Sequence, residues 1–222
     1  MLTTTVQGRT WEFSHSIGHV GQAEETFLWP YSVATSDSDL IYVINRGPDP
    51  KLGDGNRLSN INFKRIGKWK LDDEFVSDFA QNDVMWPVSL AVDKKGSLYC
   101  TDEIKNKILK YNSEDHKVLE WGVEGSAEGE LSKPAGIASD LEGDLYVVDA
   151  GNHRIQKFSN DGDFIHSWGE FGSDLGQLND PWGITVDLKG FVYVADWGNN
   201  RVQKFTGNGE WLQNFGVSFP ED

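Results

Sequence analysis

The chain has 222 residues, of which 38% are hydrophobic, 25% are charged and 12% are aromatic. This is the composition of a globular protein, and it excludes a wholly disordered or membrane-embedded chain. A formal net charge of −15 disfavours a nucleic-acid partner, which is normally held by clustered lysine and arginine. The single cysteine, Cys100, excludes an internal disulfide framework.

No apolar run is long enough to span a membrane, and the first residues lack the basic and apolar segments of a secretion signal. We therefore expect a soluble, cytoplasmic protein with neither a membrane nor a nucleic acid as its partner.

Two sequence markers recur in phase along the chain. The first is a proline that recurs at spacings of 57, 47 and 47 residues, at Pro30, Pro87, Pro134 and Pro181. The second is a polar residue with the same spacings that follows a tyrosine by three positions, at Asn45, Asp102, Asp149 and Asp196. Four short β-rich runs lie in each period, which predicts an all-β propeller built from four-stranded antiparallel blades.

In chain order, the repeat predicts one orphan strand and then four complete blades, in a single domain over residues 1–222. The orphan strand is placed at 10–18, because Ile17 precedes Pro30 by the same 13 residues that separate Trp121 from Pro134. The blades are placed at about 27–79, 85–121, 132–168 and 179–215. A Pro- and Gly-rich insertion at 46–57 lengthens the first blade and is expected to form a surface loop.

The two best-preserved units, at 134–158 and 181–205, read Pro-x-Gly-Ile, then Asp-x-x-Gly-x-(Val/Leu)-Tyr-Val-x-Asp-x-Gly-Asn-x-Arg-(Val/Ile)-Gln-Lys-Phe. This pattern resembles the NHL repeat, and the resemblance extends over residues 10–219. The unit that begins at Pro87 departs from the pattern at 103–107, where Gly-Asn-x-Arg is replaced. The resemblance implies a propeller of the six-bladed type, here shortened.

Such a six-bladed ring would need more blades than this chain supplies. The resemblance implies that the orphan strand completes the last blade. Three interpretations remain open, namely a fragment of a longer protein, chains that complete one another, and a true open propeller. We expect self-association through the open blade of the shortened ring, because exposed strand edges and apolar faces favour association.

The connections that follow the second strand and precede the next first strand gather on one face, at the mouth of the central channel. We expect a protein or small-molecule ligand to bind at this mouth face together with the blade-one insertion. The candidate ligand-binding residues there are Trp29, Tyr31, Arg46, Trp86, Trp182 and Trp197.

The repeated Asp102, Asp149 and Asp196 have two interpretations. They could form a carboxylate ring for a cation, or each could accept N–H groups of the following turn and pair with the arginine five residues later. We favour the second, structural interpretation. Calcium and zinc remain open as cofactors, but of the five histidines only His19 and His153 are expected near the mouth, and no confident metal ligands emerge.

The leading hypothesis is a binding propeller without catalysis. The alternative, which the resemblance implies, is a lyase or hydrolase of the six-bladed propeller group. Its catalytic residues would lie at the mouth, as Arg46, Asp102, His153 and Asp196. No nucleophile elbow is present, and Cys100 replaces the valines of the later repeats, so we expect it to be a buried packing residue.

Overall fold

The computed structural model describes the backbone of residues 3–6, 9–12, 19–20, 26–27, 29–46 and 64–216, and side chains at 27, 29–46 and 64–216. Within these ranges almost every element is a strand. The helices described are two single 3-10 turns, η2 (Ala150–Asn152) and η3 (Trp197–Asn199). None of the described segments is a helix with the length and apolar character of a membrane span.

Four antiparallel sheets of four strands follow one another along the chain, and we call them blades 1 to 4. Blade 1 contains β5 (Pro30–Thr35), β6 (Leu40–Asn45), β7 (Arg65–Lys70) and β8 (Phe75–Phe79). Blade 2 contains β9 (Pro87–Val92), β10 (Leu98–Asp102), β11 (Lys107–Tyr111) and β12 (Lys117–Trp121). Blade 3 contains β13 (Pro134–Ser139), β14 (Leu145–Asp149), β15 (Arg154–Phe158) and β16 (Phe164–Trp168). Blade 4 contains β17 (Pro181–Val186), β18 (Val192–Asp196), β19 (Arg201–Phe205) and β20 (Trp211–Phe215).

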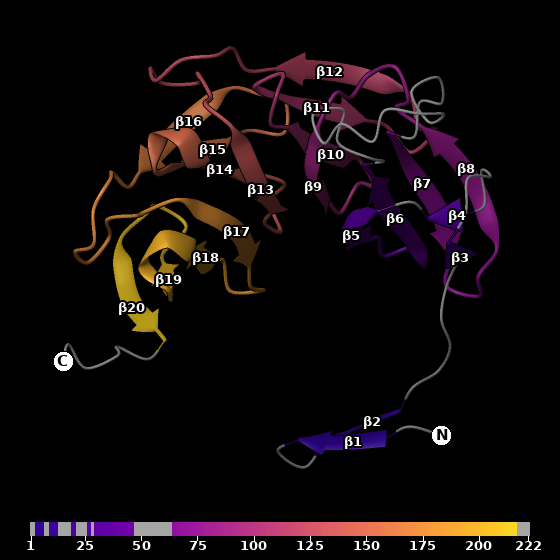
Figure 1. Cartoon of the computed structure of the whole chain (residues 1–222), viewed down its shortest axis with the longest axis horizontal. Coiled ribbons are helices and arrows are strands. Elements are labelled where there is room, and N and C mark those ends of the chain that lie inside the picture. The colour runs from indigo at the N-terminus through magenta and orange to yellow at the C-terminus, as the bar shows by residue number, and fades with distance from the viewer. Residues whose placement is uncertain are drawn as a thin grey trace, which may run out of the picture.

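The blades stand side by side in an arc, with their first strands on the inner side and their fourth strands on the outer side (Figure 1). The first strands β5, β9, β13 and β17 are in contact in that order. The predicted all-β propeller with four complete blades is therefore confirmed.

Two shorter sheets precede blade 1. Strands β1 (Thr3–Val6) and β2 (Arg9–Glu12) form an antiparallel hairpin, and β3 (His19–Val20) pairs in parallel with β4 (Thr26–Phe27). The predicted orphan strand at 10–18 overlaps β2 at its start, and residues 13–18 lie outside the described part of the chain. Most of the insertion at 46–57 also lies outside it, with Arg46 as its described residue.

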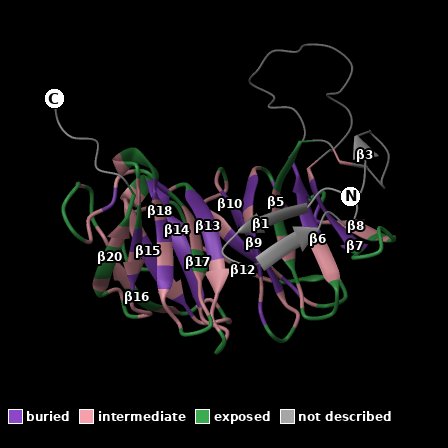
Figure 2. Ribbon diagram, turned by 90° about the horizontal axis from the view of Figure 1, so that it is seen from below, coloured by how far each residue is buried: buried purple, intermediate pink, exposed green. Residues whose placement is uncertain are grey.

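The hydrophobic core is divided into clusters that lie between neighbouring blades. The buried strands that contribute to these clusters are purple in Figure 2. Blades 1 and 2 bury Ile44 and Ile66 against Leu109. Blades 2 and 3 bury Tyr99 and Ile108 against Val147, and a third cluster joins blades 3 and 4. Since burying one such side chain contributes roughly 1.5–3 kcal/mol, contact between blades is the main source of stability.

The turn between the third and fourth strands of each later blade touches the preceding blade. In blade 3 this turn contains Gly162, whose φ is +86°, and a Cβ placed there would meet the Trp121 indole at 2.9 Å. In blade 4 the equivalent Gly209 meets Trp168 in the same way, at 2.6 Å. Glycine is therefore required at both positions for two reasons, namely the left-handed backbone conformation and the close approach of the tryptophan ring.

Gly162→Ala is expected to destabilise the protein more than Gly96→Ala does. Gly96 has a similar φ of +81° but nothing within 4 Å of an added Cβ, so its substitution adds only backbone strain of about 1–2 kcal/mol. Displacement of Trp121 should add about 1 kcal/mol or more at Gly162. Urea unfolding measures both free energies, and equal losses would contradict the packing role of Gly162.

Candidate functional site

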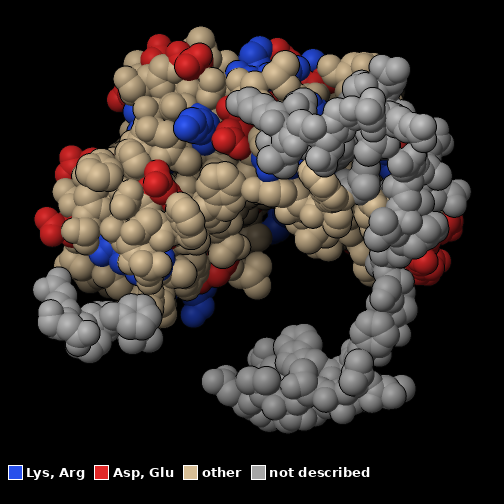
Figure 3. Space-filling view, viewed as in Figure 1, with Lys and Arg blue, Asp and Glu red and all other residues tan. Residues whose placement is uncertain are grey.

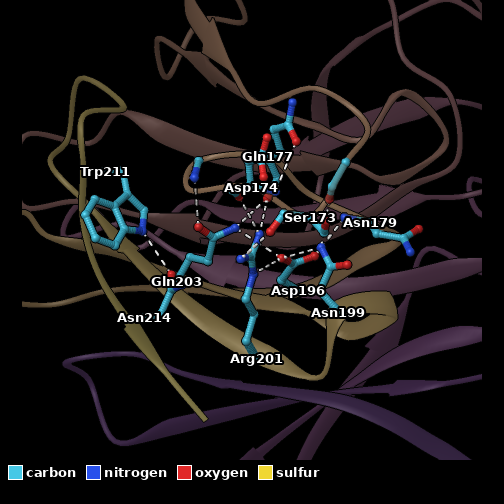
Figure 4. Close-up of polar contacts among 12 residues, drawn as sticks. Ser173, Asp174, Gln177, Asn179, Asp196, Asn199, Arg201, Gln203, Trp211 and Asn214 are labelled. Carbon is cyan, nitrogen blue, oxygen red and sulfur yellow. Dashed lines mark hydrogen bonds and ion pairs between the residues drawn. The ribbon is translucent and has the colours of Figure 1, made fainter. Parts of the chain in front are cut away.

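A buried aspartate at the end of the second strand organises the mouth face. In blade 4 the carboxylate of Asp196 is fully buried, and its Oδ1 accepts the backbone N–H of Asn179 at 2.7 Å. Its Oδ2 accepts side-chain N–H groups at 2.6–3.1 Å, from Asn199, Arg201 and Gln203. Figure 4 shows these groups converging on the carboxylate. A buried charge is tolerated in this way because its oxygens are occupied by donors.

The same donors extend outward and hold the loop at 170–179, which leads into blade 4. The Arg201 guanidinium donates at 2.8 Å to three loop carbonyl oxygens, of Ser173, Asp174 and Gln177. Gln203 also donates to the Gln177 carbonyl, at 2.6 Å, and accepts the N–H of Gly176. One arginine fork therefore links the strand end to the loop, a geometry that lysine cannot reproduce.

Blade 3 repeats the arrangement and blade 2 departs from it. Asp149 accepts hydrogen bonds from Asn152, Arg154 and Gln156 as Asp196 does from its own partners. Asp102 instead accepts the backbone N–H groups of Met85, Trp86 and Lys105. These contacts agree with the structural interpretation of the repeated aspartates.

At the boundary of blades 1 and 2, a buried arginine lies between two aromatic rings. The Arg46 guanidinium is 3.7 Å from the centre of the Tyr31 ring and 4.4 Å from that of Trp86. Its Nε donates to the Pro87 carbonyl at 2.8 Å, and Nη2 lies 3.6 Å from the Glu103 carboxylate. Burial lowers the pKa of Arg46 from its ordinary value, while Tyr31 and Glu103 oppose that shift. The arginine thereby joins the two blades.

Two of the predicted ligand-binding aromatics owe their exposure to β-bulges. Pro181 pairs with Asp196 and Ile184 with Val194, so Trp182 lies in a register shift at the start of β17. Tyr31 lies at the equivalent shift in β5. A bulge turns a side chain out of the regular alternation, and both rings are exposed although they belong to inner strands.

At the boundary of blades 3 and 4, His153 lies against the loop that leads into blade 4. Its ring is 4.9 Å from that of Phe171, and its Nδ1 accepts the backbone N–H of Asp180 at 3.2 Å. Phe171 is 68% exposed and Trp197, in the following connection, is 70% exposed. The His153 imidazole and the exposed Phe171 ring beside it provide a surface for contact.

The structure separates the four residues of the predicted catalytic set into two pairs. Arg46 and Asp102 interact electrostatically at the first blade boundary. Asp196 and His153 contact consecutive residues, Asn179 and Asp180, at the third boundary. Asp102 and Asp196 are fully buried, with their oxygens taken up by the hydrogen bonds above.

Of the predicted ligand-binding set, Trp29, Tyr31, Trp182 and Trp197 are exposed, Trp86 is half-buried and Arg46 is buried. The sequence interpretation missed other exposed apolar residues in the mouth connections, namely Met85, Ile104, Phe171 and Leu175. The repeat pattern could have indicated Phe171 and Leu175, because it already places the loop that contains them on the mouth face. Figure 3 views the face and shows broad uncharged areas between scattered charges.

Among the described residues, no three His, Cys, Asp or Glu side chains are grouped as metal ligands. Cys100 is fully buried in the cluster between blades 1 and 2, and burial raises the pKa of its thiol well above the ordinary value. It therefore packs as a small apolar residue.

The fold and the repeated strand-end network define this protein as a β-propeller. Residues 131–158 and 178–205 match the family profile of the NHL repeat. The chain therefore carries NHL repeats, in blades 3 and 4, and is a propeller of the NHL-repeat type.

Solved propeller structures share this fold at low sequence identity. The catalytically inactive virginiamycin B lyase from Staphylococcus aureus with quinupristin superposes with a TM-score of 0.63 at 18% identity, over 86% of this chain and 56% of the lyase. A streptogramin B lyase structure gives 0.60 at 18% identity, over 85% and 54%. The RRP9 WD40 repeats give 0.61 at 12% identity, over 89% and 52%.

The chain thus spans about half the length of the solved structures that it matches. Among curated proteins, none has a sequence that matches it.

Arg201→Lys is expected to loosen the loop at 170–179 without unfolding blade 4. Lysine retains the charge but loses the fork to the loop carbonyl oxygens, at about 1.5–3 kcal/mol for each charge-assisted bond. Hydrogen exchange should accelerate at the amides of Gly176, Gln177 and Leu178. Lys94→Arg, at an exposed turn of blade 2, should leave the exchange pattern unchanged. Unaltered exchange in the Arg201 variant would refute the role of the fork.

Proposed function

We propose that this protein is a binding propeller that holds a protein or small-molecule ligand on its mouth face, without catalysing a reaction. The observation that carries the proposal is the set of large apolar side chains held out to solvent there. Phe171, Leu175, Trp182 and Trp197 lie in the mouth connections and the strand start of blades 3 and 4. Apolar surface of this kind, with polar residues around it, is typical of interaction sites.

The rigidity of the support favours binding. Phe171 and Leu175 belong to the loop that Arg201 and Gln203 hold, so less conformational entropy is lost when a ligand orders them. The breadth of the surface, which includes Trp29 and Tyr31 on blade 1, favours an extended ligand such as a segment of a protein. A net charge of −15 favours a partner without a polyanionic backbone.

The lyase or hydrolase alternative receives less support. It would draw on Asp102 and Asp196 as reactive carboxylates, but both are buried and their oxygens accept hydrogen bonds within the mouth network. The likeness to the lyases, at 18% identity, is a likeness of fold.

The test is a selection of peptides from a random library on the intact protein, followed by calorimetry with the selected peptides. Trp197→Ala and Phe171→Ala should each weaken binding by about 30-fold, as aromatic anchors do. Both side chains are largely exposed, so the free energy of unfolding should change little.

Leu188→Ala is the matched control. Leu188 is 82% exposed but lies in the turn opposite the mouth, next to Asp187, whose carboxylate accepts the N–H groups of Lys189 and Phe191. The Leu188→Ala variant should bind the peptides with the same affinity as the unsubstituted protein. Peptides that bind all three variants equally, or a failure to select any, would refute the mouth-face assignment.

A further inference from the structure

The loops at 123–132 and 170–179, which lead into blades 3 and 4, are built in the same way. Each contains one isolated parallel bridge, and the two bridges lie at equivalent places. In each blade the arginine that begins the third strand donates to carbonyl oxygens of the loop, Arg154 in blade 3 and Arg201 in blade 4. Residues 47 positions apart therefore occupy equivalent places in the two loops.

The side chains at two of these equivalent places differ in chemistry. The loop at 123–132 has Glu124 and Glu128 there, and both are exposed. The next loop has Phe171 and Leu175 at the same places, and these side chains are 68% and 61% exposed. Two neighbouring loops of one design thus present a pair of carboxylates and a pair of large apolar side chains.

The exposure of these places is a property of the loop itself. Blade 3 is in contact with blade 2 on one side and with blade 4 on the other, and Glu124 and Glu128 are exposed despite both neighbours. The glutamates also show that the loop forms without an apolar side chain at either place. Folding therefore does not account for Phe171 and Leu175, whereas contact with a partner does.

The two glutamates are not neutralised within the described part of the chain. Glu124 and Glu128 form no ion pair there, and the neighbouring Arg154 is paired with the buried Asp149 at 2.8 Å. When the residue before each strand-initial proline is included, the exposed charged residues of the two loops are Glu124, Glu128, Glu170, Asp174, Asp180 and Lys133. This excess of negative charge favours a cationic partner.

The mouth face already holds one cation between aromatic rings and a carboxylate. At the boundary of blades 1 and 2, the Arg46 guanidinium lies 3.7 Å from the centre of the Tyr31 ring and 4.4 Å from that of Trp86, with the Glu103 carboxylate 3.6 Å from Nη2. Such a setting attracts a cation through the ring faces and through the carboxylate. Blade 3 has Ala150 at the place of Arg46, so a guanidinium at the boundary of blades 3 and 4 would come from a partner.

We propose that the partner of the mouth face is a basic, amphipathic segment of a protein. Its lysine or arginine side chains lie over the loop at 123–132, and its apolar side chains lie over the loop at 170–179. This inference rests on the proposed function, because it names the partner of the same surface. Apolar contact supplies most of the affinity, while the carboxylates set the direction in which the segment crosses the two loops. The net charge of −15 adds attraction at long range.

The first experiment selects peptides on the intact protein from two random libraries, one without Lys and Arg and the other without Asp and Glu. Peptides from the library that contains Lys and Arg should bind at least about tenfold more tightly in calorimetry. Equal affinities from both libraries, with Phe171→Ala still weakening them, would overturn the basic partner and leave the proposed function in place. A failure to select any peptide would overturn both.

Removal of charge tests where the basic side chains lie. With the tightest selected peptide as the probe, Glu124→Gln and Glu128→Gln should each weaken binding about threefold and the double variant about tenfold, because exposed ion pairs contribute modestly. The affinity of the double variant should also depend less on salt. Glu142→Gln is the matched control, since it removes an exposed carboxylate from a turn of blade 3 on the opposite face, and it should bind normally.

Reversal of charge tests the direction of the segment. Glu128→Lys should weaken binding of the same peptide about tenfold, and changing one particular basic residue of the peptide to glutamate should restore it. Restoration at one peptide position identifies the residue that faces Glu128, which a loss of stability would not reproduce. The proposal is overturned if changes at Glu124 and Glu128 leave the affinity unaltered while Phe171→Ala lowers it.

Discussion

A single blade of this protein cannot bury its own apolar side chains, and the rest of the structure depends on that constraint. Each described core cluster combines residues of neighbouring blades, as in the cluster that contains Ile44 of blade 1 and Leu109 of blade 2. Stability is therefore a sum of contacts between neighbours, as in other repeat architectures. The constraint also aligns the mouth loops of successive blades. Blades that pack face to face end their corresponding strands at the same level, so the connections between those strands lie on one face of the propeller.

The strand-end aspartates of blades 3 and 4 hold the mouth loops in the same way in both blades. Asp149 and Asp196 gather an arginine and a glutamine, which hold the loop leading into the same blade. Blade 2 has Lys107 at the arginine position, and Lys107 pairs with Glu120 on the outer strand instead. At that end of the arc the link between blades passes through Arg46 and its aromatic neighbours. The mouth therefore has a regular half on blades 3 and 4 and an irregular half on blades 1 and 2.

The sequence predicted the features that obey the repeat. In-phase prolines and aspartates placed the blades, because the same contacts must recur wherever one blade packs on another. The same pattern could not predict that Arg46 is buried, since its rings come from β5 and from the connection to blade 2. Nor could it predict the bulges that turn Tyr31 and Trp182 outward, because register depends on hydrogen bonds between strands rather than on residue type.

The departures from the repeat are informative because they are correlated across a contact. A turn residue in the left-handed conformation brings its Cβ, when it has one, into the space that a ring from the preceding blade would fill. Glycine at that position leaves room for Trp121 or Trp168, whereas Asp115 follows a blade that ends in phenylalanine. The ring at the end of one blade and the turn residue of the next blade are therefore matched in size, because close packing between blades tolerates neither a void nor a collision.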